Sequence, residues 1–363
     1  MRFECKGENF SNVIQQVSRA RSKTQSQNYL QDVFLNLEDH ILTLRATNLE
    51  ITCEKSFSVK GIQNGSCILK GDTLVKIIPL LKRENTVFFC ELIDGVFSIK
   101  TEKDIVEIKT TPYEDFPTLP PQGELIGSIS ILSLSTLLRE VSFCSATTEI
   151  KPEISSIFIY SKEKDLISVA TDSYRLAEKV VNNENNLNIS VLIPQKYVVD
   201  ILSILNDEEG EISIYKKDGL LTLSNSNLNL CIHIITGNFP DYRQLFPKEF
   251  STTCLIDKEE LQKSLTLTTY FTEQYSQVKC IVNDNNVTLS SKNENIGQVI
   301  NTIKTEKEGA DIEVNYNNKY FLDVFSHING NKIKLSFTTA NKPVFMEGNN
   351  DISFTYLLMP LNR

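Results

Sequence analysis

Apolar side chains recur at helical spacing at matching places along the chain. Three segments each place them at i, i+3, i+4 and i+7, the stripe by which a surface helix packs on its neighbours. The stripes are Leu74, Ile77, Ile78 and Leu81; Val198, Ile201, Leu202 and Leu205; and Phe321, Val324, Phe325 and Ile328. The second stripe starts 124 residues after the first, and the third starts 123 residues after the second. The spacing predicts three equivalent helices.

A second helical stripe repeats with the same offset. It is complete in two copies, and in the third only Leu261 and Leu265 remain, because Lys258 and Gln262 interrupt it. The complete stripes are Phe10, Val13, Ile14 and Val17, and Leu134, Leu137, Leu138 and Val141. Shorter landmarks keep the same register, namely Ala46-Thr47-Asn48 with Ala170-Thr171-Asp172 and Phe116-Pro117 with Phe239-Pro240. Repeats in register over the whole chain predict three copies of one structural unit.

Short runs of alternating apolar and polar residues, such as residues 34–37, 96–99 and 212–215, separate the helices. This alternation is typical of half-buried strands. Each helix must bury its apolar stripe, and an antiparallel sheet offers one face for it. We therefore predict an α+β fold of three repeated domains, each with two helices packed on antiparallel sheets. Linkers near residues 120–123 and 247–250 divide the chain into domains 1–121, 122–248 and 249–363.

The segment Val169–Ala177 predicts a strand, a turn and a second strand, with Thr171–Arg175 at the exposed tip. Most such turns are only connections, and from this segment alone that alternative stays open. The chain also ends in an apolar stretch, in which Tyr356–Leu358 fits a last strand. Pro360 has no N–H group for a sheet, and a Met beside a Pro suits an exposed apolar surface that receives peptides.

The composition is that of a globular protein, with 40% hydrophobic and 23% charged residues among 363. No apolar run approaches the roughly 20 residues that a membrane helix needs, and the first residues lack the apolar core of a secretion signal. We therefore expect a cytoplasmic protein without a membrane partner. The eight cysteines are scattered without a CxxC pair and are expected to be buried free thiols. The three histidines stand apart, so we expect no metal site.

The net charge of −9 argues against a nucleic-acid partner but says nothing about where the charges lie. The predicted helices and their loops carry scattered cations and no dense basic run. These are Arg19, Arg21, Lys23, Arg139, Lys151, Lys196, Lys263 and Lys319. These cations fit ordinary solvent-exposed helix faces as well as they fit contacts with duplex DNA. If they meet a duplex, the contacts are weak, non-specific and sensitive to salt.

Motifs of catalysis are missing from the sequence. It has no G-x-S-x-G elbow, no Walker A motif and no G-x-G-x-x-G loop, and no His stands near Asp172–Arg175. We therefore expect no catalytic residues, no cofactor and no enzymatic activity. An enzyme that uses the Asp172–Arg175 loop is kept as a rival, which Ser173→Ala would expose by a loss of turnover.

The chain resembles the bacterial sliding clamps, the β subunits of the replicative DNA polymerase III. The resemblance spans the whole chain and is most specific in Ala170–Ala177, Phe239–Arg243 and Tyr356–Leu361. Further matches are Gln15–Ser18, Thr47–Glu50 and Asp115–Pro117. The resemblance implies a head-to-tail homodimer closed into a ring, with helices lining the hole and sheets outside. It implies a processivity factor that encircles duplex DNA, slides on it and tethers the polymerase.

The resemblance also implies a groove that receives short peptide motifs of the replicative DNA polymerase, the clamp loader and repair proteins. By position its residues are Ile154, Thr171, Ser173, Tyr174, Arg175, Leu176, Pro240, Leu245, Leu357, Leu358, Met359, Pro360 and Leu361. Apolar walls accept Leu or Phe anchors, while Thr171 and Arg175 can hold polar groups of the peptide. The sequence departs from the family pattern at Ser173-Tyr174, at Gln244 and at Asn362-Arg363, so the preferred peptide stays open.

Two further sets of residues follow from the resemblance. The dimer interface would place Val106 and Ile108 against Tyr270 and Phe271 of the neighbouring subunit, although Val106 and Ile108 also fit a strand whose side chains alternate inward. The DNA contacts would be Arg21, Lys23, Lys151 and Lys196. Asp72 and Pro152 stand where the family often has cations, which makes the expected lining less basic. The main alternative is a clamp-like scaffold that binds peptides but does not encircle DNA.

Overall fold

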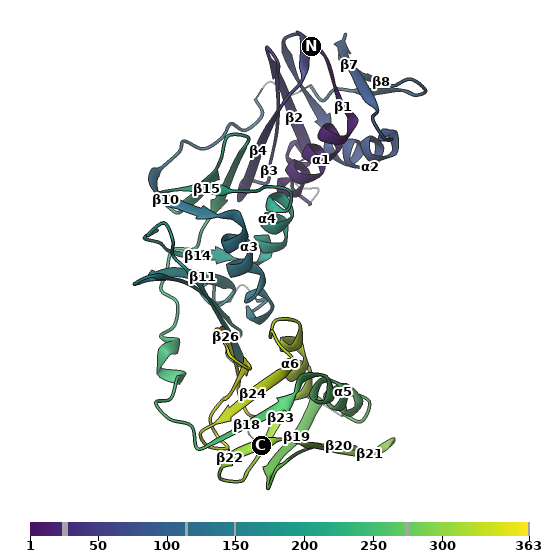
Figure 1. Ribbon diagram of the computed structural model, residues 1–363. Helices are drawn as coiled ribbons and strands as arrows, with labels where there is room; N and C mark the ends of the chain where they lie inside the picture. Colours follow the sequence, from purple (N-terminus) through teal and green to yellow (C-terminus); the bar gives the residue numbers. More distant parts are fainter. Residues whose placement is uncertain (24–27, 113–114, 149, 273–275, 362–363) are drawn as a thin grey trace. The chain divides into compact units, whose positions relative to one another are not determined.

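The computed structural model describes residues 1–23, 28–112, 115–148, 150–272 and 276–361 (Figure 1). By its internal packing the chain divides into two compact units. Unit 1 comprises Met1–Ser135, Asn185–Asn188 and Lys196–Ile234, and unit 2 comprises Thr136–Glu184, Ile189–Gln195 and Ile235–Arg363. The departure noted at Asn362-Arg363 lies outside the described residues.

Unit 1 contains two antiparallel sheets. Its strands are β1 (Arg2–Lys6), β2 (Asp32–Glu38), β3 (Ile41–Thr47), β4 (Ile51–Ser58), β5 (Lys60–Gln63), β6 (Gly65–Lys70), β7 (Val87–Ile93), β8 (Val96–Lys100), β9 (Ile105–Lys109), β10 (Glu124–Ser130), β15 (Glu211–Lys217), β16 (Leu220–Ser224) and β17 (Leu228–His233). One sheet has the order β5-β1-β7-β8-β9, and the other has the order β10-β15-β16-β17-β4-β3-β2-β6. The pairing of β17 with β4 joins strands from the first and second sequence repeats into one sheet.

The helices of unit 1 are α1 (Gly7–Val17), α2 (Gly71–Leu81) and α4 (Val198–Leu205). α1 packs against α2, β3 and β4 through the predicted stripe, all of which is buried. In α2 the stripe residue Ile77 is only half-buried. In α4 the buried face includes Ile204, and the predicted Leu202 is half-buried. The helices therefore lie where the periodicity predicts them, with one position of the α4 face shifted.

Unit 2 also contains two antiparallel sheets. Its strands are β11 (Ser156–Lys162), β12 (Asp165–Thr171), β13 (Arg175–Asn182), β14 (Ser190–Pro194), β18 (Thr252–Asp257), β19 (Gln277–Asn283), β20 (Asn286–Asn293), β21 (Gly297–Lys304), β22 (Glu306–Gly309), β23 (Ile312–Asn317), β24 (Lys332–Phe337), β25 (Val344–Gly348) and β26 (Asp351–Leu358). One sheet has the order β14-β11-β12-β13-β26-β25-β24-β18-β22, and the other has the order β21-β20-β19-β23. The last strand, β26, pairs with β13, so the two ends of the predicted peptide site lie in one sheet.

Helices α5 (Lys258–Thr269) and α6 (Asn318–Asp323) belong to unit 2, and α3 (Ile131–Arg139) spans the boundary between the units. α5 packs on α6 and on β18, β20 and β21 and buries Leu261 and Leu265, as the interrupted stripe predicts. The stripe that starts at Phe321 is buried, but α6 ends at Asp323 and a 3₁₀ turn, η7 (Val324–Ser326), continues it. The mixture of helices and antiparallel sheets confirms the α+β prediction. No helix among the described residues has the length and apolar character needed to cross a membrane.

Candidate functional site

The tip of the β12–β13 hairpin is held by its own side chains. Asp172 Oδ1 accepts hydrogen bonds from the backbone N–H groups of Tyr174 (2.9 Å) and Arg175 (3.0 Å). Thr171 Oγ1 accepts one from Ser173 N–H at 3.1 Å and donates one to the Arg175 carbonyl at 2.6 Å. Ser173 has φ +77°, a left-handed conformation that is uncommon for a residue with a side chain. These bonds fix the turn and leave the Tyr174 side chain 63% exposed.

Arg175 is bound within unit 2. Its Nε lies 2.9 Å from Asp172 Oδ2, and its Nη1 lies 2.5 Å from Asp323 Oδ2. The guanidinium also stands over the ring of Tyr320, 4.3 Å from its centroid, and only 11% of the side chain is exposed. The sequence suggested Thr171 and Arg175 as holders of a peptide's polar groups. The structure shows the hydroxyl of Thr171 and the guanidinium of Arg175 already bonded to groups of the chain.

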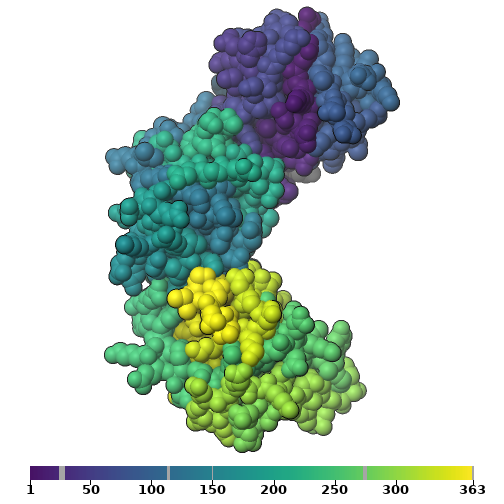
Figure 2. Space-filling view, viewed as in Figure 1, coloured from purple at the N-terminus to yellow at the C-terminus, as the bar shows by residue number. Residues whose placement is uncertain are grey.

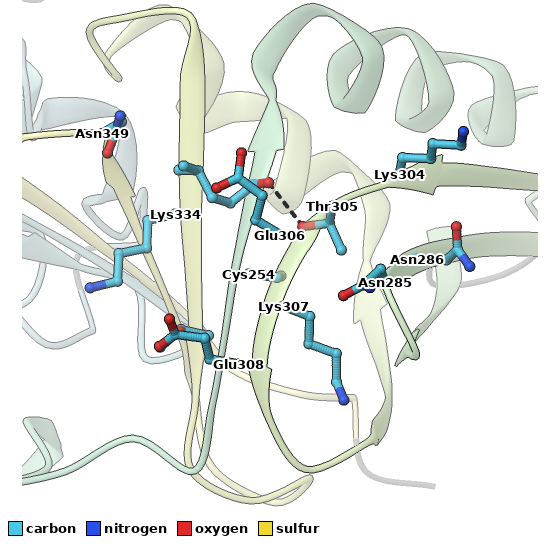
Figure 3. A pocket seen from close by; sticks show the side chains of 12 residues that line it. Cys254, Asn285, Asn286, Lys304, Thr305, Glu306, Lys307, Glu308, Lys334 and Asn349 are labelled. Atoms are coloured by element: carbon cyan, nitrogen blue, oxygen red, sulfur yellow. Dashed lines mark hydrogen bonds between the residues drawn. The ribbon is translucent and has the colours of Figure 1, made fainter.

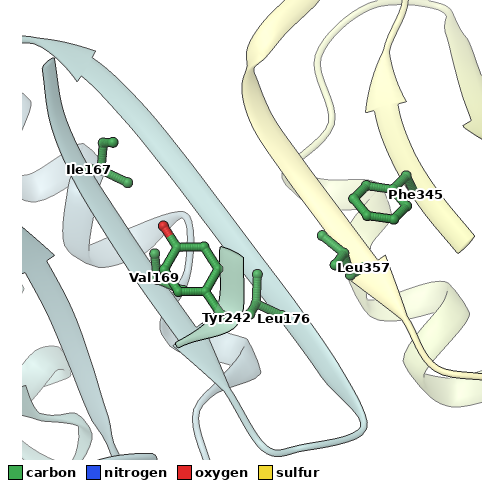
Figure 4. Close-up of a cluster of buried hydrophobic side chains, with 6 residues drawn as sticks. All are labelled: Ile167, Val169, Leu176, Tyr242, Phe345 and Leu357. Atoms are coloured by element: carbon green, nitrogen blue, oxygen red, sulfur yellow. The ribbon is translucent and has the colours of Figure 1, made fainter. Parts of the chain in front are cut away.

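Apolar side chains from three parts of the chain meet under this hairpin (Figure 4). The cluster consists of Ile167, Val169, Leu176, Tyr242, Phe345 and Leu357, and Tyr160, Val180, Phe239 and Phe246 pack around it. The register pairs Leu176 with Leu357 across β13 and β26. Both side chains are buried, with 2% and 1% exposed, and Leu358 is fully buried. Leu176 and Leu357 therefore form a floor beneath the surface, whereas Leu358, the next residue of β26, has its side chain on the opposite face of the sheet.

The remaining predicted residues are exposed or half-buried in unit 2, and Figure 2 shows yellow C-terminal parts of the chain at the surface. Ser173, Tyr174, Pro240 and Leu245 are exposed, and Ile154, Thr171, Arg175, Met359, Pro360 and Leu361 are half-buried. The tail leaves the sheet after Leu358, as the Pro predicts, and is held by its backbone: Met359 N–H donates to the Tyr174 carbonyl at 2.9 Å, and Leu361 N–H donates to the Asn315 carbonyl at 2.8 Å. The structure thus gathers an apolar rim above the buried floor.

The segment Phe239–Phe246 crosses the sheet and contains the 3₁₀ turn η5 (Tyr242–Leu245). Phe239 stacks on Phe158 with centroids 5.3 Å apart, and Phe246 meets Phe345 edge-on, also at 5.3 Å. Beneath it lies Glu178, which is 5% exposed. Sequence analysis missed this carboxylate, although its place between Leu176 and Val180 on the inward face of β13 is visible as a break in the apolar alternation.

The charges and hydroxyls around Glu178 form one network. Glu178 Oε2 accepts a hydrogen bond from the Tyr242 hydroxyl and lies 2.8 Å from Arg243 Nη2. Burial raises the pKa of Glu178, and the bond from Tyr242 and the charge of Arg243 oppose this rise. Burial and the neighbouring carboxylate raise the pKa of Tyr242, which therefore stays a donor.

The predicted DNA-contacting cations differ in how exposed they are and in which groups of the chain they contact. Arg21 donates to the Gln31 carbonyl at 2.8 Å and to Asp72 Oδ1 at 3.1 Å, and only 12% of its side chain is exposed. Lys23 pairs with Asp200 at 3.1 Å but is 77% exposed, and the ammonium of Lys196 lies 5.1 Å from the centroid of the Tyr197 ring. Lys151 is exposed. The structure thus uses Arg21 to hold unit 1 together and leaves Lys23, Lys151 and Lys196 at the surface.

Comparison with known proteins shows which family the chain resembles. Three family models match successive parts of the chain: the N-terminal domain of the DNA polymerase III beta subunit over residues 1–120, its central domain over 128–241 and its C-terminal domain over 243–362. The chain belongs to the DNA polymerase III beta subunit family. This confirms the resemblance read from the sequence, while the domain limits at 121/122 and 248/249 stay predictions.

Members of the family match over the whole length of the chain. The beta sliding clamp of Staphylococcus aureus is 24% identical over 99% of both chains, and that of Streptococcus pneumoniae is 24% identical over 97% of both. The crystal structure of the Thermotoga maritima beta subunit superposes with a TM-score of 0.93 at 22% identity, covering 100% of this chain and 99% of that one. A Pseudomonas aeruginosa clamp bound to griselimycin gives 0.93 at 20% identity over the full length of both chains. The clamp fold is thereby confirmed.

The interface residues expected from the family lie on or near edge strands. β9 is an edge of one sheet in unit 1, and β21 is an edge of one sheet in unit 2. Val106 is half-buried and Ile108 is buried in unit 1 itself, so the inward alternation is what the structure shows there. Tyr270 is 70% exposed, and Phe271 is half-buried. Sequence analysis did not select Ile105 and Ile300, which are 68% and 63% exposed on the two edge strands.

A pocket of about 870 Å³ lies beside β22 in unit 2 (Figure 3). Its wall mixes Lys304, Lys307 and Lys334 with Glu306 and Glu308. Lys307 is bonded to Asp311 at 2.7 Å, and Glu306 is bonded to Lys332 at 2.8 Å, so the wall has no dominant charge. Among the described residues, no three His, Cys, Asp or Glu side chains group closely enough to hold a metal ion.

Proposed function

We propose that the chain is a DNA sliding clamp, the processivity factor of a bacterial replicative polymerase. The observation that carries this is the match of all three beta subunit domains, in order, along the chain. Two copies would close head to tail into a ring that encircles duplex DNA. A clamp has no chemistry to perform, so we expect no catalytic activity, cofactor or metal, and we expect it to work in the bacterial cytoplasm, where the chromosome lies.

The edges of the sheets support a ring made of two copies. Within the described ranges, β9 and β21 each have a partner strand on one side only, and an exposed strand edge is a template for pairing with another chain. Ile105 on β9 and Ile300 on β21 add exposed apolar side chains to these edges. We propose that β9 of one copy pairs with β21 of the other, with Val106, Ile108, Tyr270 and Phe271 near the contact.

The apolar rim supports peptide binding in unit 2. Exposed Pro240 and Leu245 and half-buried Met359 and Pro360 lie on segments that all border the cluster around Leu176 and Leu357. Leu or Phe side chains of a partner would fill such a surface. The replicative polymerase, the clamp loader and repair proteins are the partners we propose, and each would bring a short motif.

The small number of exposed cations suits a ring that slides. Contacts from Lys23, Lys151 and Lys196 to phosphates would be few and non-specific. Retention on DNA would then depend on topological linkage rather than on affinity. The alternative, a peptide-binding scaffold of the same fold that does not encircle DNA, is not favoured by the comparisons.

One experiment separates the clamp from the scaffold. The chain is loaded by its cognate loader onto nicked circular plasmid, half of the sample is linearised, and retention is measured by gel filtration at moderate and high salt. A clamp stays on the circle at both salt concentrations and is lost from the linear form. Equal, salt-sensitive loss from both forms would refute encirclement and favour the scaffold.

A further inference from the structure

Glu178 is an ionisable group where the fold otherwise places apolar side chains. Its neighbours on the same face of β13 are Leu176 and Val180, and the residues opposite it are Val169 on β12 and Thr355 on β26. Burying a carboxylate is unfavourable unless strong partners compensate it. A valine would pack at this position without that cost. The carboxylate must therefore do something other than fill space.

Its partners all lie on the segment that crosses the sheet or on β11. One oxygen, Oε2, accepts the Tyr242 hydroxyl and meets the Arg243 guanidinium at 2.8 Å. Tyr160 closes the network, since its hydroxyl lies 2.7 Å from that of Tyr242 and accepts a hydrogen bond from Arg243 at 2.9 Å. Two consecutive residues of the crossing segment are thus bonded to a single atom of the sheet.

The stacked rings and the polar network hold the segment in different ways. The contacts of Phe239 and Phe246 with the sheet attract the segment but tolerate sliding, because apolar packing has little directionality. Hydrogen bonds to a charged acceptor are directional and short. Figure 4 shows the Tyr242 ring against the strands of Val169 and Leu176, with its hydroxyl on the side of Val169. The network therefore fixes where along the sheet η5 lies.

Two rim residues of the peptide site depend on that location. Pro240 precedes Tyr242 by two residues, and Leu245 is the last residue of η5. Both are exposed, and because Pro and Leu side chains cannot form hydrogen bonds, their location follows that of the segment's backbone. We propose that Glu178 is a positioning residue of the peptide site: by binding Tyr242 and Arg243 it sets where Pro240 and Leu245 meet an incoming apolar anchor. This inference rests on the proposed peptide-binding function.

The test compares three variants of the full-length chain. Glu178→Val removes the acceptor and matches its neighbours Val169 and Val180. Glu178→Gln keeps an oxygen that accepts from Tyr242. Lys179→Met is the matched control, because Lys179 is next in the strand, is 8% exposed, points to the opposite face and donates to Ser353 at 2.7 Å. The probe is a fluorescein-labelled hexapeptide ending in Leu-Phe, and its Kd is measured by anisotropy.

Glu178→Val is expected to raise the peptide Kd about tenfold, the scale of a lost hydrogen bond to a charged group. Glu178→Gln and Lys179→Met are expected to stay within about twofold to threefold of the wild type. Thermal stability should change little in Glu178→Val, since Arg243 is already 40% exposed and its charge can turn to water. A loss of affinity without a loss of stability is what separates positioning from general support of the fold.

Hydrogen exchange supplies a second readout that needs no peptide. The N–H of Phe246 donates to the Arg243 carbonyl at 3.1 Å, and its exchange should speed up in Glu178→Val but not in Lys179→Met. Unchanged exchange and unchanged Kd in Glu178→Val would overturn the inference, and so would an equal loss of affinity in Lys179→Met. If the wild type does not bind the peptide at all, the proposed peptide site is wrong, and the exchange data then decide separately whether Glu178 holds the segment.

Discussion

Arg175 and Asp323 lie 148 positions apart in the chain, and their side chains meet at 2.5 Å. The pair ties the tip of the β12–β13 hairpin to the end of α6, and the Tyr320 ring covers the guanidinium. The hairpin belongs to the second sequence repeat and α6 belongs to the third. Together with the pairing of β13 and β26, this ion pair connects the floor and the rim of the peptide site within unit 2.

Arg175→Ala should destabilise the chain by about 3 kcal/mol, because it leaves two carboxylates without their cation in a mostly buried site. Only 14% of the Asp172 side chain is exposed, so water replaces the lost charge poorly. Arg175→Lys should recover less than half of the loss, because an ammonium cannot bond both carboxylates and lie flat on Tyr320. Urea unfolding checks both values. A loss below about 0.5 kcal/mol for Arg175→Ala would mean that the pair behaves as an exposed surface pair.

Ile300→Glu should weaken the proposed dimer at least about a hundredfold, because pairing of β21 with another chain would bury an unpaired carboxylate. Ile300 is 63% exposed on an edge strand. Ile352→Glu is the control, since Ile352 is 87% exposed but β26 already has a neighbour on each side. Sedimentation equilibrium measures the dimer dissociation constants of both variants. Equal dissociation constants for the two variants would place the dimer contact elsewhere.

All eight cysteines should resist modification in the folded chain and react after unfolding. Every one is buried and free, as the scattered spacing predicts. Burial raises the pKa of Cys67 from 9.0 to about 12, which lowers its thiolate fraction about a thousandfold. Burial also raises the pKa of Cys254 to about 12. A thiol assay with Ellman's reagent should find almost no fast reaction natively and eight thiols in denaturant. Fast native labelling of any of them would contradict the packing described for it.

Glu178 should make stability depend on pH just above its usual pKa of 4.5. Because burial raises its pKa in the folded chain, the folded state binds a proton in a range where the unfolded state has lost it. The free energy of unfolding should therefore fall as pH rises from about 4.5 through the raised pKa, and then level off. Tyr160 and Lys162 on β11 and Tyr242 and Arg243 on η5 surround the carboxylate, and none of these residue types ordinarily titrates near pH 5. The measurement is urea unfolding of the wild type and Glu178→Gln at matched pH values. A constant difference in the free energy of unfolding between the two proteins over this range would show that burial does not raise the pKa of Glu178.

The sequence predicts the repeats, the helices and the family, because these depend on local periodicity and on short motifs. The stripes of α1 and of the Phe321 segment are buried as the spacing requires. The ion pair of Arg175 could not be predicted, because its partner Asp323 is distant in sequence. The residue type alone does not show which group an arginine will bind. The break that Glu178 makes in the apolar alternation is visible in the sequence, but its role could not be predicted, because Tyr242 and Arg243 contact it only in the folded sheet. Ile108 was predicted to lie at the dimer interface, but it is buried within unit 1. An apolar residue on an edge strand can pack in the core of its own subunit.

Arg21 and Lys151 should respond differently to removal, although both were selected from the sequence as DNA contacts. Binding to a short linear duplex is measured as a function of salt concentration, which reports the number of phosphates neutralised. Lys151→Ala should reduce the magnitude of the slope of log K against log salt by about 0.9, because an exposed ammonium can neutralise one phosphate and so release its counterion from the DNA. Arg21→Ala should leave the slope unchanged and lower stability, because Arg21 is bonded to Asp72 and to the Gln31 carbonyl. An equal drop in slope for both variants would mean that Arg21 leaves its partners on DNA, whereas no drop for Lys151→Ala would remove Lys151 from the proposed DNA contacts.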